Sequence, residues 1–222
     1  MCSGRALPAQ LQKIGGKSME RKREDAVSPV VGVMLMLVVT IIIAAVVSGF
    51  AGGLAGGTKA APQASIAVKI DTAVDNTMGG FDTKMTFEHL SGDPINTKDL
   101  KIITYYTNKT GHVYKHEQTA SSEATDLYGW GSLTRVPFLN DMRLGYAGNN
   151  PAKDFGNFTW KTGDVLSSGN VAGTADLLGI GFTRGNPDTF NETDFKPGAV
   201  VDVKILHVPS GKYIYDKEVV VE

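Results

Sequence analysis

The 222-residue chain is 42% apolar and 20% charged, and it contains 26 glycines and 9 prolines. This composition excludes both a largely disordered protein and a protein with many membrane spans. The net charge of −1 gives no basic field for a nucleic-acid partner, and the single cysteine, Cys2, excludes an internal disulfide framework or a cysteine-based metal site.

Charge is distributed unevenly along the chain. Residues 1–26 carry six lysines and arginines against three acids, whereas the remaining residues are acidic overall. We interpret residues 1–26 as a basic leader. Within it, residues 1–18 have no pattern and are assigned no function. They are either a disordered tail or an over-extended gene start, with Met19 as the alternative first residue.

The segment from Val27 to Ala51 contains no charged residue and predicts a transmembrane helix. At about 1.5 Å per residue this helix would be about 37 Å long, enough to cross a hydrocarbon core of about 30 Å. Ser28 is a suitable N-cap, and Pro29 suits the first helical position, where its missing N–H is not needed. Because the basic cluster of residues 21–23 precedes the helix, the C-terminal body should face outward.

Three kinds of N-terminal segment share these features. A secretory signal that is removed usually has a shorter apolar stretch, of about 7–15 residues, although the small residues from Ala51 to Gly53 could serve as its cleavage site. A plain signal anchor fits the length and the charge but leaves the residues at the start of the helix unexplained. In the third kind, cleavage occurs before the helix, which the mature protein retains.

The run RKREDAVSPVVGVMLMLVVTIIIAAVV resembles the N-terminus of archaeal type IV pilins, with its class III signal peptide, over roughly residues 20–57. The resemblance implies cleavage between Ala26 and Val27, with a cut nearer Glu24 as the alternative. It also implies a structural subunit that a prepilin peptidase processes and a pilus assembly machinery transfers from the membrane into a filament of identical copies. Bacterial relatives have a glutamate early in the mature helix, and none occurs here between Val27 and Ala61.

Small residues recur at every fourth position in the second half of the predicted helix. They suggest a packing face, because small side chains let two helix backbones approach closely. The alternative is that the glycines only loosen the helix into the linker. Gly32, in the pilin-like opening motif, is a further candidate for packing. The two rows are Thr40, Ala44, Ser48 and Gly52, and Ala45, Gly49 and Gly53.

Residues 52–62 have the composition of a flexible linker, and residues 63–222 are expected to form an extracellular β domain. Alternation with a period of two predicts strands in this body, and no segment after residue 60 has a convincing helical period. The sequence therefore predicts an α+β protein: a single long N-terminal hydrophobic helix followed by an all-β, sandwich-like domain. The expected strands cover residues 66–70, 81–90, 100–107, 112–118, 159–160, 177–182, 200–208 and 213–221.

No catalytic, cofactor or metal site is expected in the body, and the chain is not expected to be an enzyme. His112 and His116 have the spacing of metal ligands on a helix, but in a strand the same spacing separates them by about 13 Å. We therefore expect solvent-facing histidines rather than a zinc site.

The loop aromatics could form a carbohydrate-binding or surface-contact patch, although core packing is predicted for most of them. They are Tyr128, Trp130, Tyr146 and Trp160. Three N-glycosylation sequons lie at Asn108, Asn157 and Asn191, and Asn108 is the best placed because NKTG is a turn.

Two functions from different classes remain open at this point. The first is a pilin-like subunit, resident in the cell membrane as a precursor and then part of an extracellular surface filament, whose β domain mediates adhesion. The second is a permanently anchored extracellular β domain that binds a ligand or surface without polymerising. An anchored surface hydrolase is disfavoured, because no catalytic constellation is found in the sequence.

Overall fold

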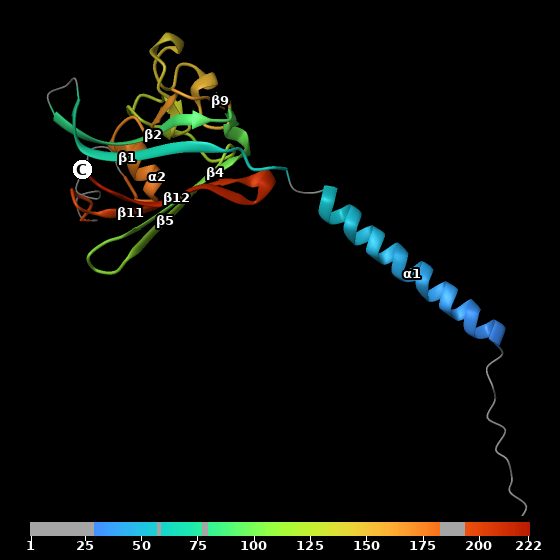
Figure 1. Ribbon diagram of the computed structural model, residues 1–222. Coiled ribbons are helices and arrows are strands. Elements are labelled where there is room, and N and C mark those ends of the chain that lie inside the picture. Colours follow the sequence, from blue (N-terminus) through green and yellow to red (C-terminus); the bar gives the residue numbers. More distant parts are fainter. Residues whose placement is uncertain (1–28, 57–58, 77–79, 183–193) are drawn as a thin grey trace, which may run out of the picture. The chain divides into compact units, whose positions relative to one another are not determined.

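A computed structural model describes residues 29–56, 59–76, 80–182 and 194–222 (Figure 1). The chain divides into two units, one ending at Gly56 and the other beginning at Gly57. The first contains the long apolar helix α1, and the second contains a mostly stranded domain. The α+β class and its order, helix first and strands after, are as the sequence predicted.

Helix α1 runs from Pro29 to Gly56. Its first residue is the proline that the sequence placed at the start, where a fixed backbone angle favours a helix and no N–H is required. Its end differs from the prediction, because the helix passes Ala51 and includes Gly52 and Gly53, which we had assigned to the linker. This extension places two good helix formers, Leu54 and Ala55, among glycines, which are poor ones.

The first sheet has four antiparallel strands in the order β1-β2-β10-β8. Its two long strands form a hairpin in which Val68 pairs with Phe87 and Ile70 with Met85. These four side chains are buried, as the alternation of apolar residues predicted. The strands are β1 (Ala64–Asn76), β2 (Gly80–Gly92), β8 (Phe138–Leu139) and β10 (Val165–Ser167).

The second sheet is also four-stranded and antiparallel, in the order β12-β11-β4-β5. Every second residue of β11 is buried, starting at Val201, so one face of this sheet is committed to the core. The strands lie within one residue of the predicted ranges. They are β4 (Leu100–Thr107), β5 (Val113–Gln118), β11 (Val200–His207) and β12 (Lys212–Val220).

Short elements complete the middle of the domain. Two-residue strands pair as β3 with β9 and as β6 with β7, and 3-10 turns lie between β3 and β4, between β8 and β9, and between β11 and β12. The bounds are β3 (Ile95–Asn96), β6 (Thr125–Asp126), β7 (Leu133–Thr134), β9 (Thr159–Trp160), η1 (Thr97–Asp99), η2 (Met142–Leu144), η3 (Pro151–Lys153) and η4 (Val208–Ser210).

The expectation of a strand at residues 177–182 and of an all-β domain was wrong at one place. Residues Val171–Leu178 form the helix α2. The Asn170 side chain accepts hydrogen bonds from the N–H groups of Ala172 and Gly173, and Gly179 ends the helix with a left-handed backbone. A side chain at Gly173 would collide with the Ser168 carbonyl oxygen, 2.0 Å from the position of its Cβ.

Both sheets and α2 contribute to one hydrophobic core. Phe87 of the first sheet, Val203 of the second and Leu177 of α2 are all completely buried in it. The edges of the two sheets also meet, because Ile70 of β1 forms a parallel bridge with Val221, the residue after β12. The domain is therefore held by packing between the sheets and by a backbone connection at one edge.

Candidate functional site

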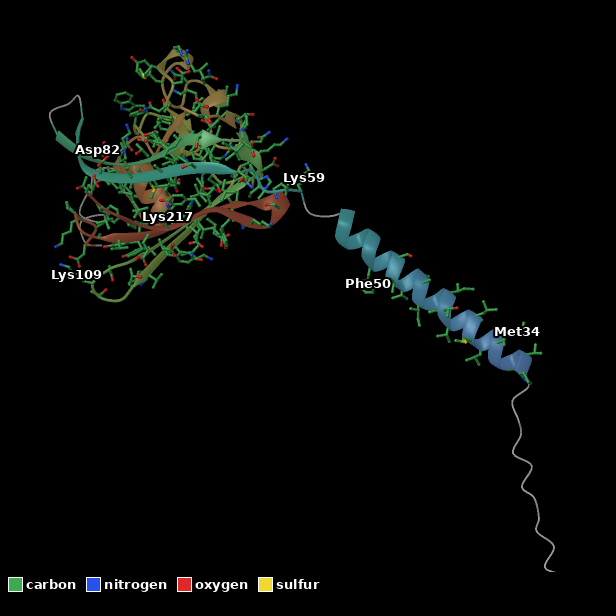
Figure 2. The ribbon with its side chains drawn as sticks, in the orientation of Figure 1. Met34, Phe50, Lys59, Asp82, Lys109 and Lys217 are labelled. Carbon is green, nitrogen blue, oxygen red and sulfur yellow. The ribbon has the colours of Figure 1, made fainter. Side chains whose placement is uncertain are left out.

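The side chains of α1 from residue 29 to residue 50 are exposed (Figure 2). Met34 and Phe50 project from the helix into open space, and Met36 is 72% exposed. The span Pro29–Phe50 is long and apolar enough to cross a membrane. So much exposed apolar surface requires a cover, which can be lipid or other apolar helices.

The small residues that we predicted as a packing face all lie on α1. Thr40, Ala44, Ala45 and Ser48 are exposed in the single chain, and the Thr40 hydroxyl donates to the Leu37 carbonyl oxygen at 2.9 Å. This internal bond satisfies the hydroxyl within its own helix, which suits an apolar environment. Their role in helix contacts remains a prediction, because the structure contains one copy of the chain.

The glycines of the predicted face leave open space beside the helix. A Cβ added at Gly32 or at Gly49 would meet no atom within 4 Å. Gly52 and Gly53 lie within α1, so the second half of the helix keeps its small residues to the end. The predicted cleavage residues Ala26 and Val27, and the predicted N-cap Ser28, lie outside the described residues.

The entry of the chain into the β domain is tightly held. The backbone N–H of Gln63 donates to the Asp93 carboxylate at 2.9 Å, and the Asp93 N–H donates to the Gln63 carbonyl oxygen at 2.8 Å. Beside them Gly92 has a φ of 115°, and a Cβ there would lie 2.1 Å from the Gln63 oxygen. The segment Ser91–Pro94 thereby fixes where the linker ends and the β domain begins.

Two of the three sequons lie among the described residues, and they differ in geometry. At Asn108, the side-chain oxygen accepts hydrogen bonds from the Thr110 hydroxyl at 2.7 Å and from the His112 N–H at 2.8 Å. At Asn157, the side-chain nitrogen donates to the Pro151 carbonyl oxygen at 2.8 Å. Asn191 lies outside the described residues.

The four loop aromatics separate into buried and exposed residues. Trp160 is almost completely buried and Tyr128 is half-buried, as expected for core packing. Trp130 and Tyr146 are 79% and 65% exposed, so the expectation of core packing was wrong for these two. Loop aromatics give no periodic signal, which is why the sequence could not separate the two groups.

The histidines and acids do not converge. His112 is exposed and packs edge-on against Tyr114, while the His116 ring hydrogen-bonds with Gln118 at 2.9 Å. Within the described ranges, no group of three or more metal-binding side chains comes together.

The chain thus combines an uncovered apolar helix, long enough to cross a membrane, with a stranded domain that follows it. Residues 25–66 match the family model of the archaeal type IV pilin N-terminal region. The resemblance that the sequence suggested is thereby confirmed for this part of the chain, which includes Asp25, Ala26, the whole of α1 and the start of β1. The search of curated proteins and the search of solved structures each found no match.

Proposed function

We propose that this chain is a structural subunit of an archaeal type IV pilus-like filament. The observation that carries the proposal is the exposed apolar surface of α1, in a segment that matches the pilin N-terminal region. The family is one of structural subunits that are assembled and polymerise, and no enzymatic role or cofactor is proposed here.

The proposed pathway begins in the cell membrane. The precursor would span the membrane through α1, with its basic leader on the cytoplasmic side. A prepilin peptidase would cut between Ala26 and Val27, and the assembly machinery would then move the helix into a bundle of identical helices. The transfer is physically reasonable because a helix satisfies its own backbone hydrogen bonds in lipid and in a bundle alike.

The β domain would form the outer surface of the filament and contact other surfaces. Its position there follows from its construction. Its apolar side chains are largely committed to its own core, and its surface carries ion pairs such as Lys69–Glu88 and Lys204–Asp216. A domain of this kind is stable in water, whereas α1 is not, so the helices would gather inside the filament and the domains outside.

The second candidate is an extracellular domain that stays anchored by α1 and does not polymerise. The same exposed helix would then be covered by lipid alone. The absence of a glutamate between Val27 and Ala61 is compatible with either candidate. The small residues from Thr40 to Gly53 favour the filament, because a helix surrounded only by lipid has no need for close helix approach.

Purification of surface filaments, followed by N-terminal sequencing of their subunit, tests the proposal. We expect filaments that contain this chain, with Val27 as the first residue. An uncut chain that is found only in the membrane would support the permanently anchored domain. A first residue near Gly53 would show ordinary signal removal and would overturn both candidates.

A further inference from the structure

One region of the β domain exposes apolar side chains on loops rather than on strands. It runs from Asp126 to Gly148 and is called the aromatic loop here; its second half is drawn in yellow at the top of the domain in Figure 1. Besides Trp130 and Tyr146, it exposes Leu133 and Met142. Exposed apolar side chains that adjoin one another form the kind of patch that marks a contact surface.

The first half of the aromatic loop is rigid. The Asp126 carboxylate accepts backbone hydrogen bonds from Gly131 at 2.9 Å, Gly129 at 2.8 Å and Tyr128 at 3.3 Å. These hydrogen bonds lower the pKa of Asp126, and the bond from Gly131 has the largest effect. The carboxylate therefore stays charged and keeps the turn around Trp130 closed. Trp130 is therefore presented to solvent by a fixed backbone.

The second half is held by a buried lysine. Lys153 is 1% exposed, and its ammonium donates to the Gly145 carbonyl oxygen at 2.5 Å, next to Tyr146. Burial lowers the pKa of Lys153, which means that the fold loses stability by keeping this charge inside. The Asn150 side chain adds a hydrogen bond to the Leu144 carbonyl oxygen at 3.1 Å. The buried Lys153 ammonium thus holds the backbone beside the exposed Tyr146 in place, although its burial lowers the stability of the fold.

The composition of the aromatic loop is that of a protein interface. Interface cores are rich in Trp, Tyr, Met and Arg and poor in Lys and Glu. No lysine or glutamate occurs between Leu127 and Asn150. Of the charged residues present, Arg135 bonds inward to the Ser122 and Phe155 carbonyl oxygens, and Arg143 is paired with Asp141 at 2.9 Å. The surface is thus aromatic and close to neutral.

A cavity of about 640 Å³ lies elsewhere on the same domain, where the ends of β4 and β12 meet the start of β11. Figure 2 shows its lining residue Lys109 at the lower edge of the domain, away from the aromatic loop at the top. The lining includes the apolar surfaces of Tyr105 and Val200, the two lysines Lys109 and Lys196, and the three acids Asp194, Asp202 and Glu218. Its volume is suited to one or two large side chains.

Two lysines at this cavity lie close to each other. The neighbouring Lys109 lowers the pKa of Lys196, because two adjacent positive charges disfavour each other, and the negative charge of Asp194 opposes this shift only in part. The ion pairs found within the described part of the chain include neither lysine. An aromatic face placed over such an ammonium is attracted to it. The domain already uses this contact internally, with Lys115 over Tyr105 and Lys217 over Tyr215.

We propose that the aromatic loop of one subunit docks at the Lys109–Lys196 cavity of the next subunit. The occupant of the cavity is thus a second copy of this chain. Two different surfaces on separate parts of one domain make a head-to-tail contact, which does not close a symmetric dimer and, in a filament, continues from subunit to subunit. The aromatic rings of Trp130 and Tyr146 supply the faces, and the paired lysines supply the cations. This inference rests on the proposed filament and adds a contact between its outer domains.

Cysteine cross-linking in assembled filaments tests the contact. Cleavage after Ala26 would remove Cys2, so the mature chain would contain no native cysteine. We would introduce Met142→Cys at the aromatic loop and Val200→Cys at the cavity, leaving Trp130 and both lysines intact. A short bis-maleimide should give the double variant a ladder of dimers, trimers and longer chains, whereas each single variant should stop at dimers. Leu90→Cys with Val200→Cys is the matched control, since Leu90 is exposed outside the aromatic loop.

Labelling provides an independent measurement. Met142→Cys in intact filaments should react with a soluble maleimide at least tenfold more slowly than in filaments dissociated with detergent. Intact filaments without a ladder, or with equal labelling rates, would show that the loop faces solvent and would overturn the contact while leaving the filament itself in place. If Met142→Cys prevents assembly, Leu133→Cys replaces it. Absence of filaments from the unmodified, processed chain would instead reject the proposed function.

Discussion

Ile70 and Val221 form a parallel backbone bridge that joins the first strand of the β domain to its last residues. The Glu222 N–H donates to the Ile70 carbonyl oxygen at 2.9 Å, and the Thr72 N–H donates to the Glu222 carbonyl oxygen at 2.9 Å. Since β1 directly follows the linker, any pull on the linker acts first on this strand. The bridge connects it to the second sheet as well as to its own.

We expect Val221→Ala to lower the free energy of unfolding of the β domain by about 1–3 kcal/mol, because the buried side chain leaves a void between the two sheets. Val220→Ala is the matched control. Its side chain is 56% exposed, and it should change stability by less than about 0.5 kcal/mol. Denaturant unfolding of the full chain in detergent measures both. Equal effects of the two variants would show that the Val221 side chain does not stabilise the packing between the sheets.

A second expectation concerns acid stability. Glu117 on β5 contacts Lys115 at 2.8 Å and Lys101 of β4 at 3.0 Å, and these partners, Lys115 foremost, lower its pKa from 4.5 to about 2. Because the folded state favours the charged carboxylate, the ion pairs of Glu117 stabilise the fold above pH 4.5. This stabilisation is lost as the pH falls toward 2. The group is exposed, so the effect is small.

Glu117→Gln should therefore reduce the drop in melting temperature between pH 5 and pH 2 while leaving the other contributions to acid unfolding intact. Glu123→Gln, at an exposed glutamate outside the ion pairs of the described residues, is the control. Thermal unfolding at the two pH values provides the comparison. A drop as large in Glu117→Gln as in the unchanged protein would contradict the role of the two lysines.

The sequence predicted the elements whose residues carry a clear period. Strand β4 was predicted with its exact bounds, because Leu100–Thr107 combines β-branched and aromatic residues with alternation. Helix α2 was missed because six of its eight residues are buried, so no polar face marks a helical period. Its signals were instead local: Asn170 before it and Gly179 after it. A capping pair around eight residues is weak evidence before the tertiary structure is known.

The candidate site was predictable in part for a similar reason. A long uncharged run specifies an apolar helix, and the opening motif at Val27–Gly32 supports the pilin assignment. The exposure of Trp130 was not predictable, because it depends on the turn that the Asp126 carboxylate closes by accepting hydrogen bonds from the N–H groups of Gly129 and Gly131. Which side of α1 meets another helix also depends on a partner rather than on the chain itself.

Processing can be tested at a single residue. If Ala26 is the last residue of the leader, Ala26→Phe should leave most of the chain uncut in the membrane, because a bulky side chain would not fit where a small one is required. Ala26→Ser, which keeps the residue small, should be cut normally. Immunoblotting separates precursor from product by mass. Normal processing of Ala26→Phe would indicate that the peptidase cuts at another site, such as the one nearer Glu24.

Glycosylation should be strongest at Asn108. Its side-chain nitrogen donates no hydrogen bond among the described residues, and the Thr110 hydroxyl is already bonded to its side-chain oxygen, whereas the Asn157 nitrogen is engaged by Pro151. We expect Asn108→Gln to lower the intact mass of most native subunits by one glycan. Asn157→Gln should lower the mass of a smaller fraction of the subunits. Asn140→Gln, outside any sequon, should change it only by the substitution. A native mass equal to that of the bare polypeptide would reject modification at all three sequons.

The last prediction concerns the helix face. Ala44→Leu and Gly49→Leu should permit insertion and cleavage but weaken filament assembly. Leucine is an excellent helix former, and a Cβ at Gly49 meets no atom within 4 Å beyond its chain neighbours and the adjacent helix backbone, so neither variant should disturb α1 itself. The added bulk can act only against a neighbouring helix, where overpacking costs about 1–3 kcal/mol at each contact. Because every subunit repeats the contact, a modest cost per site should reduce filament yield strongly.

Val39→Leu is the control for this pair, since Val39 lies outside both rows of small residues and its substitution also adds bulk. Filament yield, measured beside the amount of processed subunit in the membrane, separates assembly from insertion and cleavage. Loss of filaments in Ala44→Leu and Gly49→Leu, with normal filaments in Val39→Leu, would place the interface on the small rows. Normal filaments from all three variants would mean that α1 packs through another face. Equal loss from all three would mean that the bundle is tightly packed on every side, and that the spacing of the small residues carries no special role.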